Sequence, residues 1–256
     1  MKQLSVLIHK ELIELIRTGK VTLLVIVFTI FGIMNPALAK LTPWMLGLMG
    51  SSLADQGITI GVITVNALTA WTQYYKNLLM EYILILAVFS GMFAQEYQSG
   101  TLVNILTKGV SRGKVAAAKL TAALLGWSVC YWLAFFITLG YGAYFWGDAL
   151  MRGVWLAAAC AYLLGVWLLT LELAFASVFS SGMYALLSVF SVYAVCYALS
   201  MIPALASVLP TQLGDGFALL TGDRAAADFL PAVWISLALS AVNAALMMLG
   251  FSKKQL

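Results

Sequence analysis

The chain has 256 residues, of which 63% are hydrophobic and only 9% charged, and its mean hydropathy is +0.98. Soluble globular domains use roughly 45–50% apolar and about 25% charged residues, so this composition excludes a soluble fold. The formal net charge of +4 does not by itself indicate nucleic-acid binding, because a basic membrane protein need not bind nucleic acid. A helix needs about 20 apolar residues to cross a bilayer, so the length allows several spans and leaves little for an aqueous domain. Any energy-converting domain must therefore come from another polypeptide.

Residues 1–19 predict an amphipathic helix that lies in the membrane interface. One side of the helical wheel carries the apolar residues Leu4, Leu7, Ile8, Leu12, Leu15 and Ile16. The other side carries Gln3, Lys10, Glu14 and Arg17. A secretory signal has a short basic region followed by an apolar core, whereas here charges of both signs are interleaved with apolar residues. We therefore expect this segment to stay on the mature protein.

Six apolar runs follow, each long enough to cross the bilayer as a helix. They cover about 21–39, 78–95, 120–146, 154–179, 183–202 and 232–251. We expect Asn35-Pro36 to loosen the last turn of the first span, because proline removes one helix hydrogen bond. The predicted fold is one all-α transmembrane domain over residues 1–256, with six transmembrane helices after the interfacial helix.

Three longer connections separate these spans. Segments 40–77 and 203–231 contain prolines, glycines and acidic residues, and both are expected to be external. In the first, Trp71, Tyr74 and Tyr75 resemble the aromatic belt of a membrane interface. The apolar patches of the second predict short reentrant or interfacial helices. The connection 96–119 carries four cations and is expected to be cytoplasmic.

The distribution of cations predicts the orientation, because Lys and Arg are enriched in cytoplasmic loops. With both termini cytoplasmic, ten of the 14 cations lie on that side, namely Lys2, Lys10, Arg17, Lys20, Lys108, Arg112, Lys114, Lys119, Lys253 and Lys254. The external side then has the acidic residues Asp55, Asp148, Asp215, Asp223 and Asp228. Six spans with both ends inside are consistent with this asymmetry.

The cytoplasmic connection between the second and third spans is the most informative stretch. Residues 101–106 can form a short helix with Leu102, Ile105 and Leu106 on one face, and Ser111 suits the N-cap of the next helix. An apolar face that projects from the membrane is typical of a docking helix. The alternative is a linker that rests on lipid headgroups, and the pattern alone leaves both open.

Several stretches of this chain resemble one known family, the ABC-2-type permeases, which are six-span membrane subunits of bacterial ABC exporters. The resemblance covers the whole chain and rests on Lys10-Glu11-Leu12, Tyr74-Tyr75-Lys76-Asn77, Glu96, Ser99-Gly100-Thr101-Leu102, Lys108-Gly109-Val110-Ser111-Arg112, Lys119 and Phe251-Ser252-Lys253-Lys254-Gln255-Leu256. The chain departs from the family at Tyr97-Gln98, where relatives usually have more charge, and at Gly109, where they commonly have proline. These departures blur which ATPase the chain would accept.

The resemblance implies an elbow helix at the N-terminus and a coupling helix after the second span that fits a cleft in a separate cytoplasmic ATPase. The implied ATPase-docking residues are Glu96, Ser99, Gly100, Thr101, Leu102, Ile105, Leu106, Lys108, Ser111 and Arg112. It further implies a second permease copy or a homologous permease, a location in the plasma membrane, and outward movement of an antibiotic, peptide or lipid. ATP and Mg would be bound by the partner, with no cofactor on this chain.

The chain itself offers no nucleotide or metal motif. Gly109 and Gly113 have three residues between them and Val115 follows Lys114, whereas a phosphate-binding loop needs four residues and then Ser or Thr. The only histidine, His9, excludes a paired-histidine zinc motif. Each of the three cysteines lies in an apolar run, where it behaves as a small hydrophobic residue. We therefore expect no catalytic site and no metal site.

Two acidic residues, Glu81 and Glu172, lie inside predicted spans, where a carboxylate is unfavourable enough to suggest a function. Both are candidates for the translocation path. For Glu81 the alternative is a solvated side chain or one paired with Lys76, and for Glu172 it is a structural hydrogen bond to a neighbouring helix. The aromatic residues of the third span could line a route for cargo, or simply face lipid and pack between helices.

Three functions are compatible with a chain of this composition. The first is a non-catalytic permease subunit of an ATP-driven exporter for a hydrophobic or amphipathic substrate. The second is an ion-gradient-driven secondary transporter or channel, which would favour more intramembrane acids or broken helices in matched halves. The third is an intramembrane enzyme, which the single histidine and the lack of a Gly-x-Ser-x-Gly elbow argue against. The sequence favours the first.

Overall fold

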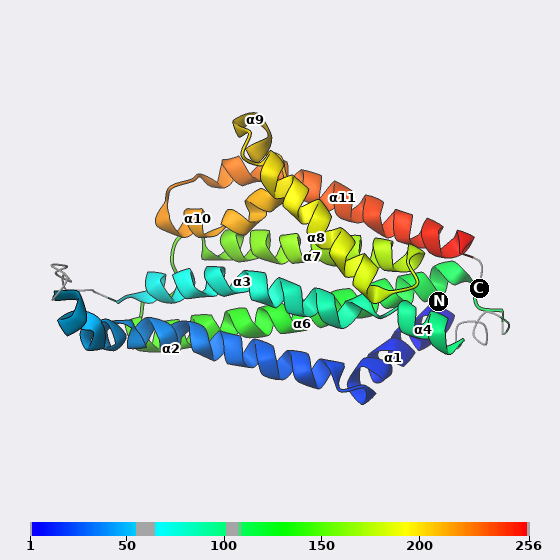
Figure 1. The fold of residues 1–256 in the computed structure, drawn as a ribbon, viewed down its shortest axis with the longest axis horizontal. Coiled ribbons are helices and arrows are strands. Elements are labelled where there is room, and N and C mark those ends of the chain that lie inside the picture. Colours follow the sequence, from blue (N-terminus) through cyan, green and yellow to red (C-terminus); the bar gives the residue numbers. More distant parts are fainter. Residues whose placement is uncertain (1, 55–64, 101–106, 108, 255–256) are drawn as a thin grey trace.

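A computed structural model describes residues 2–54, 65–100, 107 and 109–254. All regular secondary structure of these residues is helical (Figure 1). The helices are α1 (Lys2–Arg17), α2 (Lys20–Ala54), α3 (Ala67–Ser90), α4 (Ala94–Ser99), α6 (Arg112–Trp146), α7 (Val154–Val178), α8 (Gly182–Leu199), α9 (Pro203–Ala206), the 3-10 helix η1 (Pro210–Asp215), α10 (Phe217–Thr221) and α11 (Ala226–Lys253).

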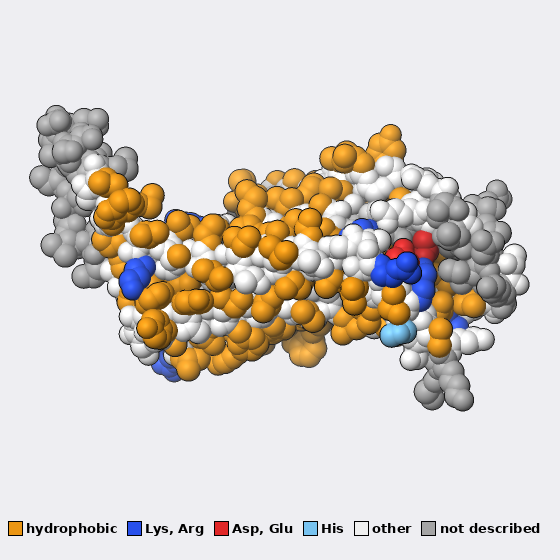
Figure 2. All heavy atoms as spheres, turned by 90° about the horizontal axis from the view of Figure 1, so that it is seen from below, with side chains coloured by type: hydrophobic (Ala, Val, Ile, Leu, Met, Phe, Trp, Pro, Cys, Tyr) orange, Lys and Arg blue, Asp and Glu red, His pale blue; other side chains and the backbone are white. Residues whose placement is uncertain are grey.

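Six of the described segments are long and apolar enough to cross a membrane. They are Lys20–Met45, Ala67–Gln98, Arg112–Trp146, Val154–Val178, Gly182–Leu199 and Ala226–Lys253. Figure 2 shows hydrophobic side chains over the middle of the molecule, with charged side chains towards its two ends. The predicted all-α fold with six spans is confirmed, and both termini lie at the same end of the bundle (Figure 1).

Helices α2, α6 and α11 extend beyond the apolar runs that predicted them and α3 begins before its run, whereas α7 and α8 stay close to theirs. The first long helix continues through Pro36 and Pro43 to Ala54, so Asn35-Pro36 does not end it. The expected external segment 40–77 is therefore helical over 40–54 and again from Ala67, and residues 55–64 lie outside the described part of the chain. An apolar run marks the part of a helix that suits hydrocarbon, whereas the backbone hydrogen bonds continue into the polar flanks.

Segment 203–231 forms the short helices expected of it and folds back onto the bundle. It contains α9, η1 and α10, and α11 already begins at Ala226. The 3-10 helix η1 packs against α7 and α11, and its Leu213 is completely buried. The last span thus begins six residues earlier than the apolar run indicated.

Two of the three aromatic residues expected in an interfacial belt, Trp71 and Tyr74, belong instead to the interior. Trp71 and Tyr74 are 2% and 0% exposed, and they pack against Phe135 of α6. The indole nitrogen of Trp71 donates a hydrogen bond to the carbonyl oxygen of Ala149 at 3.1 Å. A buried Trp needs such a partner for its single polar group. The interfacial prediction was wrong for Trp71 and Tyr74, because sequence proximity to charged residues does not reveal which helix face is covered.

A buried polar node joins three of the long helices. The Asn35 side chain of α2 donates to the Thr138 hydroxyl of α6 at 3.2 Å and accepts a hydrogen bond from the Asn77 amide of α3 at 2.7 Å. The Thr138 hydroxyl in turn donates to the carbonyl oxygen of Gly32 at 3.1 Å. Since apolar side chains gain little from leaving lipid for one another, such interhelical hydrogen bonds help to specify which helices pair.

Candidate functional site

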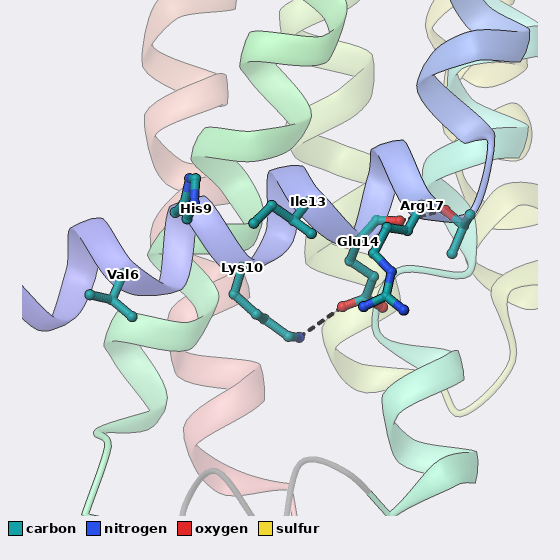
Figure 3. Close-up of a pocket in the computed structure, with 7 residues that line it drawn as sticks. Val6, His9, Lys10, Ile13, Glu14 and Arg17 are labelled. Carbon is teal, nitrogen blue, oxygen red and sulfur yellow. Dashed lines mark hydrogen bonds and ion pairs between the residues drawn. The ribbon is translucent and has the colours of Figure 1, made fainter.

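The first helix is a separate element that crosses the bundle at the end where the termini lie. It ends at Arg17, and Gly19 then adopts a left-handed backbone with φ of 72°, a conformation that glycine tolerates without strain. Figure 3 shows α1 crossing the helices behind it. It packs mainly against α6, with Glu11 and Leu15 buried at 3% and 5% exposure.

The outward face of α1 combines apolar and charged side chains. Val6, Ile13 and Ile16 are 66%, 40% and 59% exposed, so Ile16 does not belong to the buried side on which the helical wheel placed it. Seven residues line an open groove of about 630 Å³ along this face (Figure 3), namely Val6, His9, Lys10, Ile13, Glu14, Arg17 and Thr18. The helix thus has one apolar face on the bundle and another facing outward, as an interfacial position would require.

A buried lysine lies at the centre of the charged cluster that joins α1 to the bundle. Lys119 of α6 is 1% exposed, and its ammonium nitrogen lies 3.0 Å from Glu11 and 2.9 Å from Glu96. The same nitrogen donates to the carbonyl oxygen of Met92 at 3.2 Å. Two of these contacts, to Glu11 and to the carbonyl oxygen of Met92, are hydrogen bonds, and the contact with Glu96 is an ion pair.

Lys10 closes the cluster on the more exposed side. Its ammonium group contacts Glu11 at 3.0 Å and Glu14 at 2.9 Å, and it is hydrogen-bonded to Glu96 as well. Burial acts to lower the pKa of Lys10, but the hydrogen bonds to Glu96 and Glu14 and the nearby charge of Glu11 outweigh it and raise this pKa above its ordinary value. Lys10 is therefore positively charged throughout the neutral pH range.

Three carboxylates of this cluster come close enough to one another to suggest a cation site. They belong to Glu11, Glu14 and Glu96. Two ammonium groups, those of Lys10 and Lys119, already lie among them. The arrangement is better described as an ion-pair network, which fixes α1, α4 and α6 relative to one another, than as a ready-made metal site.

This network lies at the base of the α4–α6 connection, residues 100–111. Gly100 ends α4 in a left-handed conformation with φ of 66°. Ser111 occupies the N-cap position of α6 as expected, although its side chain makes no capping hydrogen bond. Of the residues predicted to dock an ATPase, Thr101, Leu102, Ile105, Leu106 and Lys108 lie outside the described residues. Glu96 is 3% exposed, so its side chain faces the bundle.

The other side of the connection is held by Arg112. Its guanidinium donates hydrogen bonds to the carbonyl oxygens of Phe251, Ser252 and Lys254. These carbonyls end α11, where the helix leaves its last acceptors without partners and where a cation is favourable. Glu96 and Arg112 thus tie the two sides of the connection to the bundle.

Two further residues near the connection, Tyr97 and Lys254, were not among the predicted docking residues. The Tyr97 hydroxyl donates to the carbonyl oxygen of Ser177 at 3.0 Å, and the Lys254 ammonium donates to that of Val178 at 2.9 Å. Lys254 also lies 3.8 Å from the centre of the Tyr97 ring. Both residues thus donate hydrogen bonds to the last carbonyl oxygens of α7. In the sequence, Tyr97 and Lys254 are only an aromatic residue and a cation at the polar ends of two spans. Nothing in their spacing indicates that they contact each other or the end of α7.

The two intramembrane acids lie on different helices, Glu81 on α3 and Glu172 on α7. Both are 0% exposed, and within the described part of the chain no hydrogen bond reaches any of their four carboxylate oxygens. The burial of Glu81 rules out the solvated alternative, and Lys76 is exposed, with no ion pair to Glu81 among the described residues. For Glu172, the burial comes without the hydrogen bond that a structural role would supply.

Comparison with known proteins gives one family. The model of the ABC-2 family transporter proteins matches residues 5–238, which is most of the chain. A comparison with the curated proteins finds no significant match.

Proposed function

This chain belongs to the ABC-2 family of transporter proteins, whose members are membrane subunits of ABC transporters, and we propose that it works in an ATP-driven exporter with a separate ATPase. The chain is a multi-pass membrane protein with six apolar helices, and its family is generally non-catalytic. ATP and Mg would be bound and used by the partner. The α4–α6 connection would carry the motion of that partner to the spans.

The observation that carries this proposal is the attachment of the α4–α6 connection on both sides. Before it, Glu96 pairs with Lys119 of α6 and Lys10 of α1. After it, Arg112 binds the end of α11. A segment that merely rested on lipid headgroups would need no such attachments. A segment that receives force from a docked partner needs such attachments, because only rigid contacts transmit its motion to the spans.

The docking surface itself would comprise the apolar face predicted within residues 101–106, together with the polar residues around it. Ser99, Gly100, Thr101, Lys108 and Ser111 complete this proposed surface. Glu96 and Arg112 would act from behind it, by holding its two sides in place. This division of roles refines the sequence-based proposal, in which all ten residues belonged to the docking site.

A second permease, identical or homologous, would complete the membrane domain, and both termini would be cytoplasmic in the plasma membrane. The concentration of cations at the end with the termini supports this orientation. Outward transport of a hydrophobic or amphipathic antibiotic, peptide or lipid rests on the family resemblance alone.

Co-purification tests the docking proposal. We expect Leu102→Asp and Leu106→Asp to release the ATPase while the membrane domain stays folded, because a charge on the apolar face opposes its burial in the partner. The matched control is Leu205→Asp, which places the same charge on an exposed leucine of α9. If both variants retain the ATPase as the control does, the docking assignment is wrong.

Glu172 and Glu81 are proposed as groups on the translocation path, reached when the helices rearrange. Their burial without hydrogen-bond partners among the described residues supports a role beyond packing. It is also the observation that favours the alternative of an ion-gradient-driven transporter. Proteoliposomes containing the chain and its ATPase separate the two: transport that needs ATP and persists without an ion gradient supports the exporter, and the reverse supports the alternative.

A further inference from the structure

A polar pocket of about 430 Å³ lies at the end of α8, away from the termini and from the charged cluster of α1. Two tyrosines one turn apart on α8, Tyr193 and Tyr197, form one part of its lining. Thr211 and Gln212 of η1 form another, and Asp215 and Arg224 complete it. Its volume is within the range of small-molecule sites, and its lining supplies donors, acceptors and aromatic rings.

Two side chains that line the pocket have hydrogen-bonding capacity that the described residues leave unused. Gln212 donates its amide nitrogen to the carbonyl oxygen of Asp228 at 3.1 Å. A carbonyl can only accept, so this bond fixes the amide orientation and leaves the Gln212 oxygen as an acceptor. That oxygen and the Thr211 hydroxyl are both shielded from solvent, and neither has a hydrogen-bond partner in the part of the chain described. A buried polar atom without a partner costs about 1–3 kcal/mol, which a bound ligand could offset after a small movement of the lining.

The charged residues of the pocket form a loose pair with room for a ligand. The Arg224 guanidinium lies 3.8 Å from the Asp215 carboxylate, and the two side chains are 40% and 66% exposed. At this distance the pair makes no close hydrogen bond, and exposed pairs of this kind contribute little to stability. A ligand with a positive and a negative group could therefore engage each partner without breaking a strong interaction.

We propose that this pocket binds a zwitterion in which a primary ammonium group lies a few bonds from an anionic group, as in phosphoethanolamine. Asp215 and the unused oxygens of Thr211 and Gln212 receive the N–H groups of the ammonium. Tyr193 and Tyr197 belong to the same lining, where a ring face turned to the ammonium would add a cation–π contact. Arg224 binds the anionic group, which suits the planar guanidinium. This proposal depends neither on ATP coupling nor on the direction of transport.

Two sources could supply this chemistry, the headgroup of phosphatidylethanolamine and a free small molecule. The full-length chain in nanodiscs of phosphatidylcholine alone is titrated with phosphoethanolamine, and the binding is followed by ligand-observed NMR. We expect saturable binding there. If nanodiscs that contain phosphatidylethanolamine abolish it, the lipid headgroup is the occupant, and if binding persists, the free zwitterion is.

Two matched probes test the recognition itself. Ethanolamine lacks the anion, and phosphocholine has the same charges but no N–H donors, so we expect each to bind at least about tenfold more weakly than phosphoethanolamine. Binding of phosphocholine that equals that of phosphoethanolamine would overturn the proposal. So would the absence of phosphoethanolamine binding in the phosphatidylcholine nanodiscs.

Variants of the exposed charged pair should leave the fold intact and change the selectivity. We expect Asp215→Asn to lower the affinity for phosphoethanolamine by about tenfold or more. We expect Arg224→Gln to make phosphoethanolamine and ethanolamine bind with equal affinity. Asp223→Asn is the control, because Asp223 is near in sequence but does not line the pocket. An unchanged preference for phosphoethanolamine in the Arg224→Gln variant would contradict the site.

Discussion

The ammonium nitrogen of Lys119 lies 2.9 Å from a carboxylate oxygen of Glu96, with the two side chains only 1% and 4% exposed. This pair joins α6 to α4 directly below the α4–α6 connection, and Glu11 brings α1 to the same lysine. A buried ion pair is weak evidence for stability by itself, because removing both charges from water is costly. Its geometry nevertheless defines how three helices meet at one point.

We expect Lys119→Met to lower the free energy of unfolding by about 3–5 kcal/mol, because it leaves Glu11 and Glu96 buried with too little positive charge. Unfolding of the purified protein in detergent measures this. The control, Lys114→Met, removes an exposed lysine that also bonds to α1, through Gln3 at 2.7 Å. Adding Glu96→Gln to Lys119→Met should recover part of the loss. Equal midpoints for Lys119→Met and Lys114→Met would show that the buried pair does not hold the helices.

Arg112→Gln should loosen the end of α11 without unfolding the bundle. The guanidinium bonds to the carbonyls of Phe251 and Ser252 at 3.2 and 3.3 Å, and a cation at a helix C-terminus contributes about 0.3–1 kcal/mol. We therefore expect amide hydrogen exchange over the last turn of α11 to accelerate roughly twofold to fivefold. Lys253→Gln removes a charge from the same helix end, where no side-chain contact of Lys253 is described, and should change the exchange less. The reverse order would argue against Arg112 as the anchor.

Asn35→Leu should destabilise the protein by about 1–3 kcal/mol for each polar group that it leaves unpaired. The group at stake is the Asn77 amide, which donates to Asn35, because the Thr138 hydroxyl keeps its hydrogen bond to the carbonyl oxygen of Gly32. Combining Asn35→Leu with Asn77→Leu should cost less than the sum of the single changes, because the second change removes the orphaned amide. Thr42→Val is the control, since that hydroxyl bonds only within its own helix. Strict additivity would show that the node is not a coupled unit.

The parts of the fold that follow from hydropathy were predictable, and the parts that depend on helix faces were not. Six apolar runs predicted six spans, because a segment in lipid must make its backbone hydrogen bonds internally and therefore forms a helix. The same runs gave wrong helix ends, because helices continue into less apolar sequence. The helix α2 continues through Pro43, and α6 already begins at Arg112. Trp71 was assigned to the surface because its sequence neighbours are polar, although its own face of α3 is covered by α6.

The charged cluster shows a similar division. Lys119 was recognised as a cytoplasmic cation from its place between spans, yet its burial could not be predicted, because the two carboxylates it meets come from α1 and α4. The contact with Glu11 joins residues 108 positions apart, which local spacing does not encode. The same holds for the pocket at the end of α8, which assembles only when η1 folds back beside that helix.

Gly165→Ala tests how closely α6 and α7 must pack. A Cβ atom at this position would lie 2.2 Å from the Trp127 ring, and that indole is itself fixed by a hydrogen bond to the carbonyl oxygen of Tyr162 at 3.1 Å. The indole cannot move aside without losing this bond, so we expect a loss of about 1–3 kcal/mol in the free energy of unfolding. Gly140→Ala, on α6, meets no atom within 4 Å and removes the helix penalty of glycine, so it should be neutral or stabilising by up to about 1 kcal/mol. Unfolding in detergent and near-UV circular dichroism of the tryptophans measure both variants. If Gly165→Ala is as stable as Gly140→Ala, the helices have room to separate, and the close contact is not required for the fold.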